Sequence, residues 1–146
     1  MPPGNFGTRD IGNPNNNTAD ISRQIREGVN ASDLAYHGGR LELGDAGTLE
    51  LNGETGFSSA IKDDLATVIA KPNAICVFSD VSGPGNNATF SVRGFAGVRI
   101  MSLKLPGSMN TRHMIVQPAL VVDDATITGP GPGPSYFVYH PVRLTK

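Results

Sequence analysis

The sequence has only one cysteine, Cys76, among its 146 residues. A single cysteine cannot form an intramolecular disulfide or a thiolate metal cluster. Cys76 lies in the apolar run 74–78, where the expected role is that of a small buried hydrophobic side chain. A reactive thiolate would need an electropositive and partly open setting. The sequence therefore predicts a structural cysteine.

Long hydrophobic runs and an excess of charge of one sign are also lacking. No segment approaches the roughly 20 apolar residues that span a bilayer, and no apolar signal-peptide core follows Met1. The 12 basic and 13 acidic residues leave a formal charge of -1, which gives no basic face for nucleic acid. We expect a soluble chain without a nucleic-acid partner. The loop-like residues 2–7 predict that Met1 marks an internal boundary of a longer protein.

Glycine and proline, in contrast, are abundant. The 18 glycines and 11 prolines make up about one residue in five, which is typical of a fold with many turns. The Gly-, Pro- and Asn-rich residues 1–16 are predicted to form an N-terminal arm or linker. Residues 17–146 are predicted to form a single β-rich domain, because a chain of this length can bury one ordinary core.

Two short helices are predicted. The first covers about residues 18–27, with Asn17 or Thr18 as its N-cap and Gly28 as its stop. Residues 32–36 are expected to add one further helical turn.

The second helix is predicted to begin at a cap formed by Ser58 or Ser59 and to end before Pro72. Its apolar residues recur at the spacing of one buried helix face. These residues are Ile61, Leu65, Val68 and Ile69.

The remaining pattern predicts about six strands. Residues 41–43 and 48–51 are expected to pair as a hairpin, followed by strands at 74–79, 88–93 continuing to 105, 114–122 and 136–144. In strand 88–93 the side chains of Ala88, Phe90 and Val92 are predicted to face inward.

Glycine and proline residues within the predicted strands indicate where the sheet bends or ends. Gly94 and Gly97 are expected to bend the strand 88–105, and Pro118 implies an edge position or a bulge. The predicted fold class is mainly β (α+β), with a small curled antiparallel sheet or barrel and two short helices.

The segment Ser59-Ala60-Ile61-Lys62 is the strongest catalytic pattern, an S-x-x-K at a helix N-terminus. Serine enzymes with this motif also need S-D-N-like and K-T-G-like elements. Ser79-Asp80-Val81 matches the first poorly, and no K-T-G occurs. We therefore predict a serine cap followed by a solvated lysine, no catalytic residue, and a chain that is not an enzyme.

No metal or cofactor site is predicted. The histidines His37, His113 and His140 have no second ligand at the short spacings of a helical metal site, although distant residues can converge. Neighbouring side chains in Asp63-Asp64 and Asp123-Asp124 point in different directions, so neither pair forms an acid/base dyad.

Other loop motifs also give no ligand site. Residues 80–83 and 123–126 do not reproduce a calcium loop. The Gly-Pro loops at 83–85 and 129–133 lack the lysine and the free amides of a phosphate loop. Three N-x-S/T sequons, at Asn16, Asn30 and Asn87, matter only in a host that glycosylates exported proteins.

A series of segments resembles, in the same order, the C-terminal region of TadE/TadG-like Flp (Tad) pilus-assembly proteins, especially long forms of the planctomycete type. The resemblance covers about residues 4–127. The segments are 4–8 (GNFGT), 15–20 (NNNTAD), 56–65 (GFSSAIKDDL), 83–90 (GPGNNATF), 95–100 (FAGVRI) and 115–119 (IVQPA).

Proteins of this family carry one N-terminal membrane helix, with the remainder outside the cytoplasm, and act in building or anchoring pili. The resemblance implies a bacterial extracytoplasmic module, periplasmic or at the cell surface, joined to the membrane only through an N-terminal helix of the parent protein. No catalytic or ligand-binding residue carries over from the family.

Three functions are consistent with these observations. The first is a non-enzymatic extracytoplasmic interaction module of a pilus-assembly or cell-envelope protein, whose sheet edges or loops contact other pilus or envelope proteins. The second is a self-assembling extracellular structural protein, because exposed strand edges pair between chains. The third is a small-ligand-binding or hydrolytic envelope domain built from Ser59, Lys62, His113 and His140.

Overall fold

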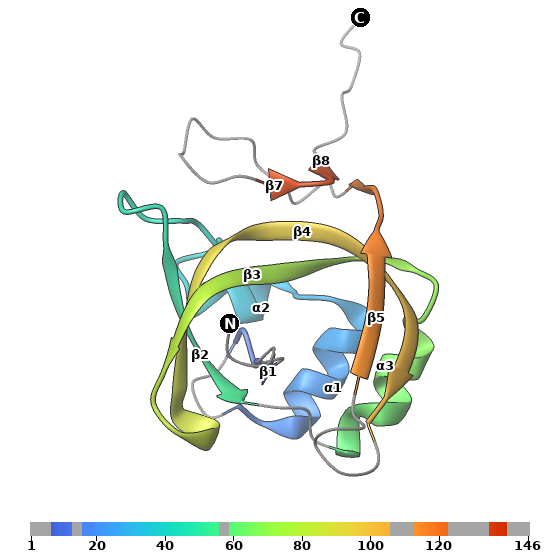
Figure 1. The fold of residues 1–146 in the computed structure, drawn as a ribbon. Helices are drawn as coiled ribbons and strands as arrows, with labels where there is room; N and C mark the ends of the chain where they lie inside the picture. The colour runs from blue at the N-terminus through green and yellow to red at the C-terminus, as the bar shows by residue number, and fades with distance from the viewer. Residues whose placement is uncertain (1–6, 13–15, 56–58, 106–112, 123–134, 140–146) are drawn as a thin grey trace, which may run out of the picture.

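The computed structural model describes residues 7–12, 16–55, 59–105, 113–122 and 135–139 (Figure 1). Strand accounts for 44% and helix for 25% of it, which confirms a mainly β (α+β) fold with short helices. The main sheet is antiparallel except for one short strand and does not close into a barrel, so the barrel alternative is wrong.

The sheet is organised around one long strand, β4 (Ala88–Lys104). Strand β3 (Pro72–Ser82) runs antiparallel along one side of it. The other side is shared by β2 (Leu49–Thr55) and β5 (His113–Pro118), both antiparallel to β4, and by the short parallel strand β7 (Ser135–Tyr136) between them.

Two smaller pairings complete the strands. β1 (Gly7–Thr8) adds to the outer edge of β2, so part of the predicted arm belongs to the sheet. β6 (Val121–Val122) and β8 (Val138–Tyr139) form a separate two-stranded parallel sheet. In Figure 1 the long β3 and β4 arch over β1 and the helices.

The curl of the sheet comes from irregular registers along β4. The pairing of β3 with β4 shifts on either side of Phe78, and the pairing with β5 shifts between Ile100 and Ser102. Such bulges bend a strand and increase its twist. The bulge predicted near Gly94 is present, because the partner of Val77 is Gly94 and that of Phe78 is Val92, whereas β4 passes Gly97 without a register shift against β3. The inward orientation of Ala88, Phe90 and Val92 is confirmed, because all three are buried.

The first helix is confirmed. α1 (Thr18–Glu27) has Asn17 as its N-cap, whose side chain accepts the N–H of Ala19 at 2.9 Å, and it ends at Gly28. The expected helical turn nearby is α2 (Ala31–Ala35), which begins with a capping box between Asn30 and Asp33.

The second predicted helix is shorter than expected. A 3-10 turn (Ser59–Ile61) leads into α3 (Lys62–Thr67), and β3 already begins at Pro72. The N-cap of α3 is Ile61, which has no side-chain cap, so the prediction of a cap at Ser59 is wrong. Ser58 lies outside the described residues.

One core cluster joins the helices to the end of the sheet. It combines α1, α3 and the segment that precedes it, and the C-terminal part of β4, and it explains the buried face predicted for the second helix. Its buried members are Ile21, Ile61, Leu65, Val68, Ile100 and Leu105, with Ile69 packed against them.

The predicted hairpin of 41–43 and 48–51 is wrong. The turn itself closes, because the N–H of Gly44 donates to the carbonyl of Thr48 at 2.9 Å. Residues 41–43 form no strand, however, and β2 pairs with β1 and β4 instead. Pairing of β2 with the longer strand β4 therefore replaces the predicted local pairing with residues 41–43.

The strand predicted at 114–122 is also shorter than expected. The strand 114–122 divides after Pro118, which has no N–H to continue a ladder, into β5 and β6. Among the described strands β5 pairs only with β4, which confirms the edge position. Of the strand predicted at 136–144, Tyr136 belongs to β7 and Val138–Tyr139 form β8, whereas residues 140–144 lie outside the described part.

Candidate functional site

The residues of the S-x-x-K pattern form no enclosed site. Ser59 lies in the 3-10 turn and Lys62 begins α3, and both are exposed. His113, at the start of β5, is exposed as well. These described members of the third functional hypothesis therefore do not surround a protected reaction centre. His140, Asp123 and Asp124 lie outside the described residues.

The other candidate ligands also remain dispersed. Across the described segments, no group of three or more His, Cys, Asp or Glu side chains could hold a metal ion. Asp63 is exposed, whereas Asp64 forms an ion pair with Arg26 of α1. Hydrogen bonds from Ser22 and then Arg26 hold the pKa of the Asp64 carboxyl below its usual value. Asp64 thus connects α3 to α1.

Two of the three sequons have structural roles. Asn16 is buried, and its side chain donates to Oδ1 of Asn52 and accepts the N–H of Asp10. Asn30 caps α2 with its side chain. Asn87 is exposed at the end of the turn before β4. A glycan would therefore disturb the packing at Asn16 in particular.

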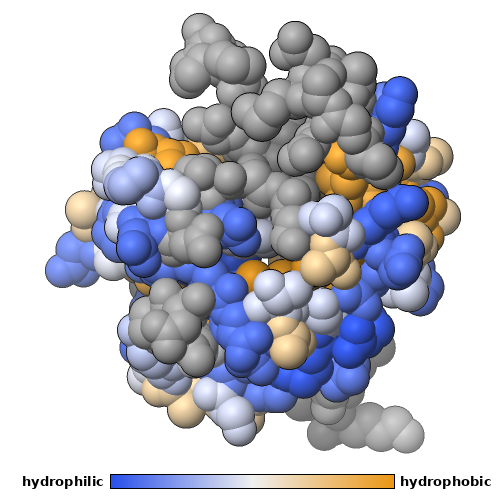
Figure 2. Space-filling model, turned by 90° about the horizontal axis from the view of Figure 1, so that it is seen from below, coloured by the Kyte–Doolittle hydropathy of each residue, from blue (hydrophilic) through white to orange (hydrophobic). Residues whose placement is uncertain are grey.

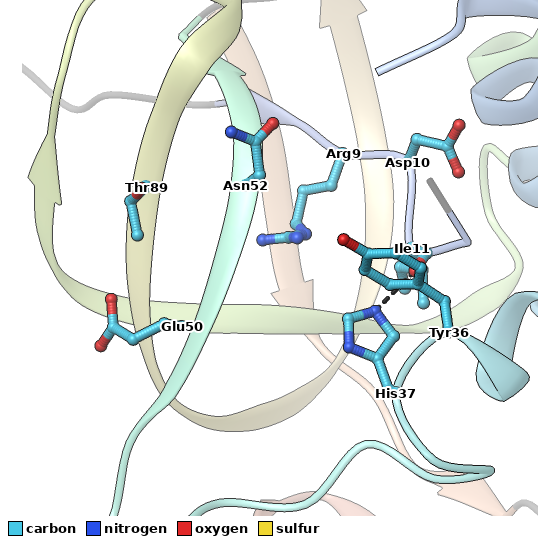
Figure 3. Close-up of a pocket in the computed structure, with 8 residues that line it drawn as sticks. All are labelled: Arg9, Asp10, Ile11, Tyr36, His37, Glu50, Asn52 and Thr89. Carbon is cyan, nitrogen blue, oxygen red and sulfur yellow. Dashed lines mark hydrogen bonds between the residues drawn. The ribbon is translucent and has the colours of Figure 1, made fainter. Parts of the chain in front are cut away.

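A cavity of about 280 Å³ lies where the chain leaves β1 and passes the end of α2 (Figure 3). The segment after β1, the residues that follow α2, and strands β2 and β4 all contribute to its lining. The lining residues are Arg9, Asp10, Ile11, Tyr36, His37, Glu50, Asn52 and Thr89. His37 is the one candidate ligand from the sequence that lies here.

Hydrogen bonds hold the wall of this cavity in place. Nε2 of His37 donates to the carbonyl of Ile11 at 2.6 Å, because a carbonyl oxygen can only accept. The ring of Tyr36 meets that of His37 edge-on, with centroids 5.1 Å apart. These contacts join the end of α2 to the segment after β1.

Arg9 is the cavity's cation. Its Nε and Nη1 atoms are buried without a hydrogen-bond partner among the described residues. Burial is the main reason that the pKa of Arg9 falls to about 10, and the nearby Cys76 and Asp10 offset this only in part. Oδ2 of Asp10, in the same lining, is likewise buried without a hydrogen-bond partner among the described residues.

A second feature is the strand β5, which pairs with β4 alone among the described strands. The segment His113–Pro118 contains no Lys, Arg, Asp or Glu. Ile115 and Val116 are 53% and 38% exposed, and neighbours on a strand face opposite ways. Apolar side chains are therefore exposed on both faces of this edge.

Further exposed apolar side chains lie on or after the neighbouring strands. They are Met101, Leu120, Val122, Tyr136 and Phe137. Figure 2 shows a mostly hydrophilic face of the molecule, with hydrophobic surface toward its upper right and a smaller area toward its upper left.

No protein-family model, curated protein or solved structure that was compared with the chain matches it. The resemblance to TadE/TadG-like proteins therefore stays a prediction from the sequence. Of the helices that the structure describes, none is long and apolar enough to cross a membrane.

The sequence predicted the edge strand but not the cavity. Pro118 indicated the edge position of β5. The Arg9 cavity carried no recognisable motif, because its lining comes from four separate segments. Arg9, the cation of the cavity lining, also lies within the predicted arm, where no packed side chain was expected.

Proposed function

We propose that the chain is a non-catalytic interaction module of an extracytoplasmic pilus-assembly or cell-envelope protein. In this proposal the free edge of β5 pairs with a strand of another pilus or envelope protein. The observation that carries it is an edge strand with exposed Ile115 and Val116 and with no charged residue.

Edge strands of soluble proteins are usually protected by charged side chains, by proline or by a covering element. Among the described residues, β5 has the proline at its end but no charged side chain and no second partner strand. Addition of a partner strand would supply hydrogen bonds to its backbone, while pockets for alternate side chains would provide specificity. The extracytoplasmic setting and the pilus partner rest on the resemblance of the segments quoted above.

A photoreactive side chain on the edge strand tests this proposal. p-Benzoylphenylalanine would replace Gln117, which is exposed on β5, in the parent protein of a bacterium that makes it. We expect a crosslink to a pilus or envelope protein after irradiation. The double variant Ile115→Lys and Val116→Lys should abolish the crosslink, because two lysines oppose edge pairing.

The matched control places the same photoreactive group at Lys62, which is exposed on α3. An adduct of equal yield from this position, or no adduct from Gln117, would contradict a role for β5. Failure of an external protease to reach the chain, even after the outer membrane is permeabilised, would contradict the extracytoplasmic setting.

Self-assembly is the second candidate, because the same edge could accept a second copy of this chain. The exposed apolar residues around β5 favour it. In that case the crosslinked species would have the mass of a dimer, and light scattering would show a mass that rises with concentration. A monomer over a wide concentration range would exclude this candidate.

A further inference from the structure

Two backbone hydrogen bonds show which residues of β5 face away from β4. The N–H of Ala119, just after β5, donates to the carbonyl of Gly97 on β4 at 3.0 Å. The carbonyl of Ile100, whose partner on β5 is Val116, instead accepts the N–H of Ala70 at 2.9 Å, on the β3 side of β4. Because successive residues of an antiparallel strand point their backbone groups to opposite sides, the N–H and C=O of Val116 face outward.

The same alternation continues toward the start of β5. The register shift in this pairing places its extra residue, Met101, on β4, so β5 itself is regular. The outer edge therefore presents the N–H and C=O groups of Met114 and Val116, and the C=O of Pro118. Proline has no N–H, so the ladder that a partner strand can form ends at this residue.

The residues with outward-facing backbone groups carry side chains of the core face. Met114 packs against the core cluster, and Val116 lies opposite the buried Ile100. Ile115 and Gln117 belong to the other face, where both are exposed. A partner strand therefore needs apolar residues where it bonds to Met114 and Val116, and a further apolar residue opposite Ile115.

We infer that this partner is β5 of a second copy of the chain, paired antiparallel about a two-fold axis at Ile115. Pairing centred there places Met114 of each copy opposite Val116 of the other. Both are hydrogen-bonded pairs, which exchange an N–H and a C=O in each direction. The exposed Ile115 side chains of the two copies lie opposite each other on the outer face. The strand is thus complementary to itself in both its backbone groups and its side chains.

The charge of β5 agrees with this choice of partner. In a two-fold pairing, a charge near the middle of the strand would lie close to its own copy, and like charges across strands are destabilising. β5 contains no Lys, Arg, Asp or Glu, so pairing with itself has no such cost. The interface is closed at two copies. This inference rests on the strand pairing proposed above and favours its second candidate.

Cysteine crosslinking tests the register. Residues opposite each other outside the hydrogen-bonded pairs have Cα atoms about 4.5 Å apart, which a disulfide can span. With oxidised glutathione, the purified Ile115→Cys chain should form a disulfide-linked dimer at least about 10-fold faster than the Gln117→Cys chain. Gln117 is the matched control, because it is exposed on the same face but would lie opposite His113 of the second copy. Cys76 is common to both chains.

Sedimentation equilibrium of the unchanged chain measures the association. The short ladder predicts a weak dimer, with a Kd on the order of 100 μM. Val116→Pro should weaken it at least about 10-fold, because it removes an N–H that faces the second copy and none that bonds to β4. Val116→Thr keeps this N–H and the branched shape, and should weaken the dimer less. The crosslinking comparison still decides if Val116→Pro does not fold.

The inference is overturned if the two cysteine variants crosslink at equal rates, if Val116→Pro dimerises as the unchanged chain does, or if the mass grows beyond two copies. A chain that stays monomeric up to about 1 mM also overturns it. A photocrosslink from Gln117 to a different envelope protein, without a dimer, would overturn this inference and leave the proposed function intact. The absence of both a dimer and such a crosslink would contradict both.

Discussion

Arg23 of α1 and Asp33 of α2 form an ion pair, with Nη2 of Arg23 2.5 Å from Oδ1 of Asp33. The other oxygen of Asp33 accepts the N–H of Asn30 at 2.9 Å, which completes the capping box of α2. Burial alone would raise the pKa of Asp33, but the hydrogen bonds from Asn30, Arg23 and Gln24 and the charge of Arg23 lower it overall. One buried carboxylate thus fixes α2 and joins it to α1.

Replacement of this carboxylate should destabilise the chain. Asp33→Ala removes the cap and leaves Arg23 without its partner, so we expect the free energy of unfolding to fall by about 2 kcal/mol. Urea denaturation measures this change. The control Glu42→Ala breaks the exposed ion pair of Arg40 and Glu42 and should change stability by less than about 0.5 kcal/mol. Equal effects of the two variants would contradict a structural role for Asp33.

The pH dependence of stability should have a defined sign. The pKa values of Asp33 and Asp64 are lowered in the folded chain, so the unfolded chain binds more protons at acidic pH. Their contribution is complete above the unfolded pKa of about 4 and is lost as the pH falls through the lower folded values. Urea midpoints should therefore decrease from pH 5 toward pH 2.

A double variant, Asp33→Asn with Asp64→Asn, should flatten this pH profile. The variant with Asp45→Asn, an exposed turn residue, should retain the slope of the unchanged chain. An unchanged slope in the double variant would show that other carboxylates govern acid unfolding.

Gly97 of β4 should not tolerate a side chain. A Cβ at this position would lie 2.3 Å from the carbonyl oxygen of Ala119 and 2.5 Å from that of Phe137. Gly97→Ala should therefore cost about 3 kcal/mol or displace the segment around β6 and β7. Gly44→Ala is the control, because its nearest contact is an ordinary 3.5 Å. Urea denaturation and amide exchange of residues 119–122 would report both effects, and two equally stable variants would contradict the prediction.

Cys76 should react slowly in the folded chain. Burial raises the pKa of its thiol, which Arg9 lowers only in part, so little thiolate forms at neutral pH. Iodoacetamide at pH 7.4 should label the native chain many-fold more slowly than the chain unfolded in urea. Similar rates in the two states would mean that β3 leaves the thiol open to solvent.

Sequence patterns predicted correctly those features that depend on a single helix or strand. Asn17 and Gly28 bound α1 because capping depends on residues next to the helix. Pro118 placed β5 at an edge because proline lacks the N–H that a second neighbour would need. The alternation around Phe90 gave the buried face of β4, since that period is a property of the strand itself.

The wrong predictions concern which other segment of the chain a helix or strand pairs with. The hairpin at 41–51 had a suitable turn and alternating residues, yet β2 pairs Leu49 with Val92 and Leu51 with Phe90. Burial of β2 against the long strand β4 was more favourable than a hairpin ladder with residues 41–43. The second helix ends at Thr67, ahead of Pro72, because Ala70 adopts a positive φ of 64° and its N–H donates to the carbonyl of Ile100 on β4 at 2.9 Å.

The sequence by itself determined the mainly β class, the position and caps of α1, the inward face of β4 and the edge at Pro118. Each of these depends on backbone chemistry within a few residues. Only the tertiary structure decided which strands meet, how bulges curl the sheet around β4, and that Arg9, Tyr36 and Asn52 line one cavity. Those features bring together segments far apart in the chain, and their energies depend on burial that no local pattern records.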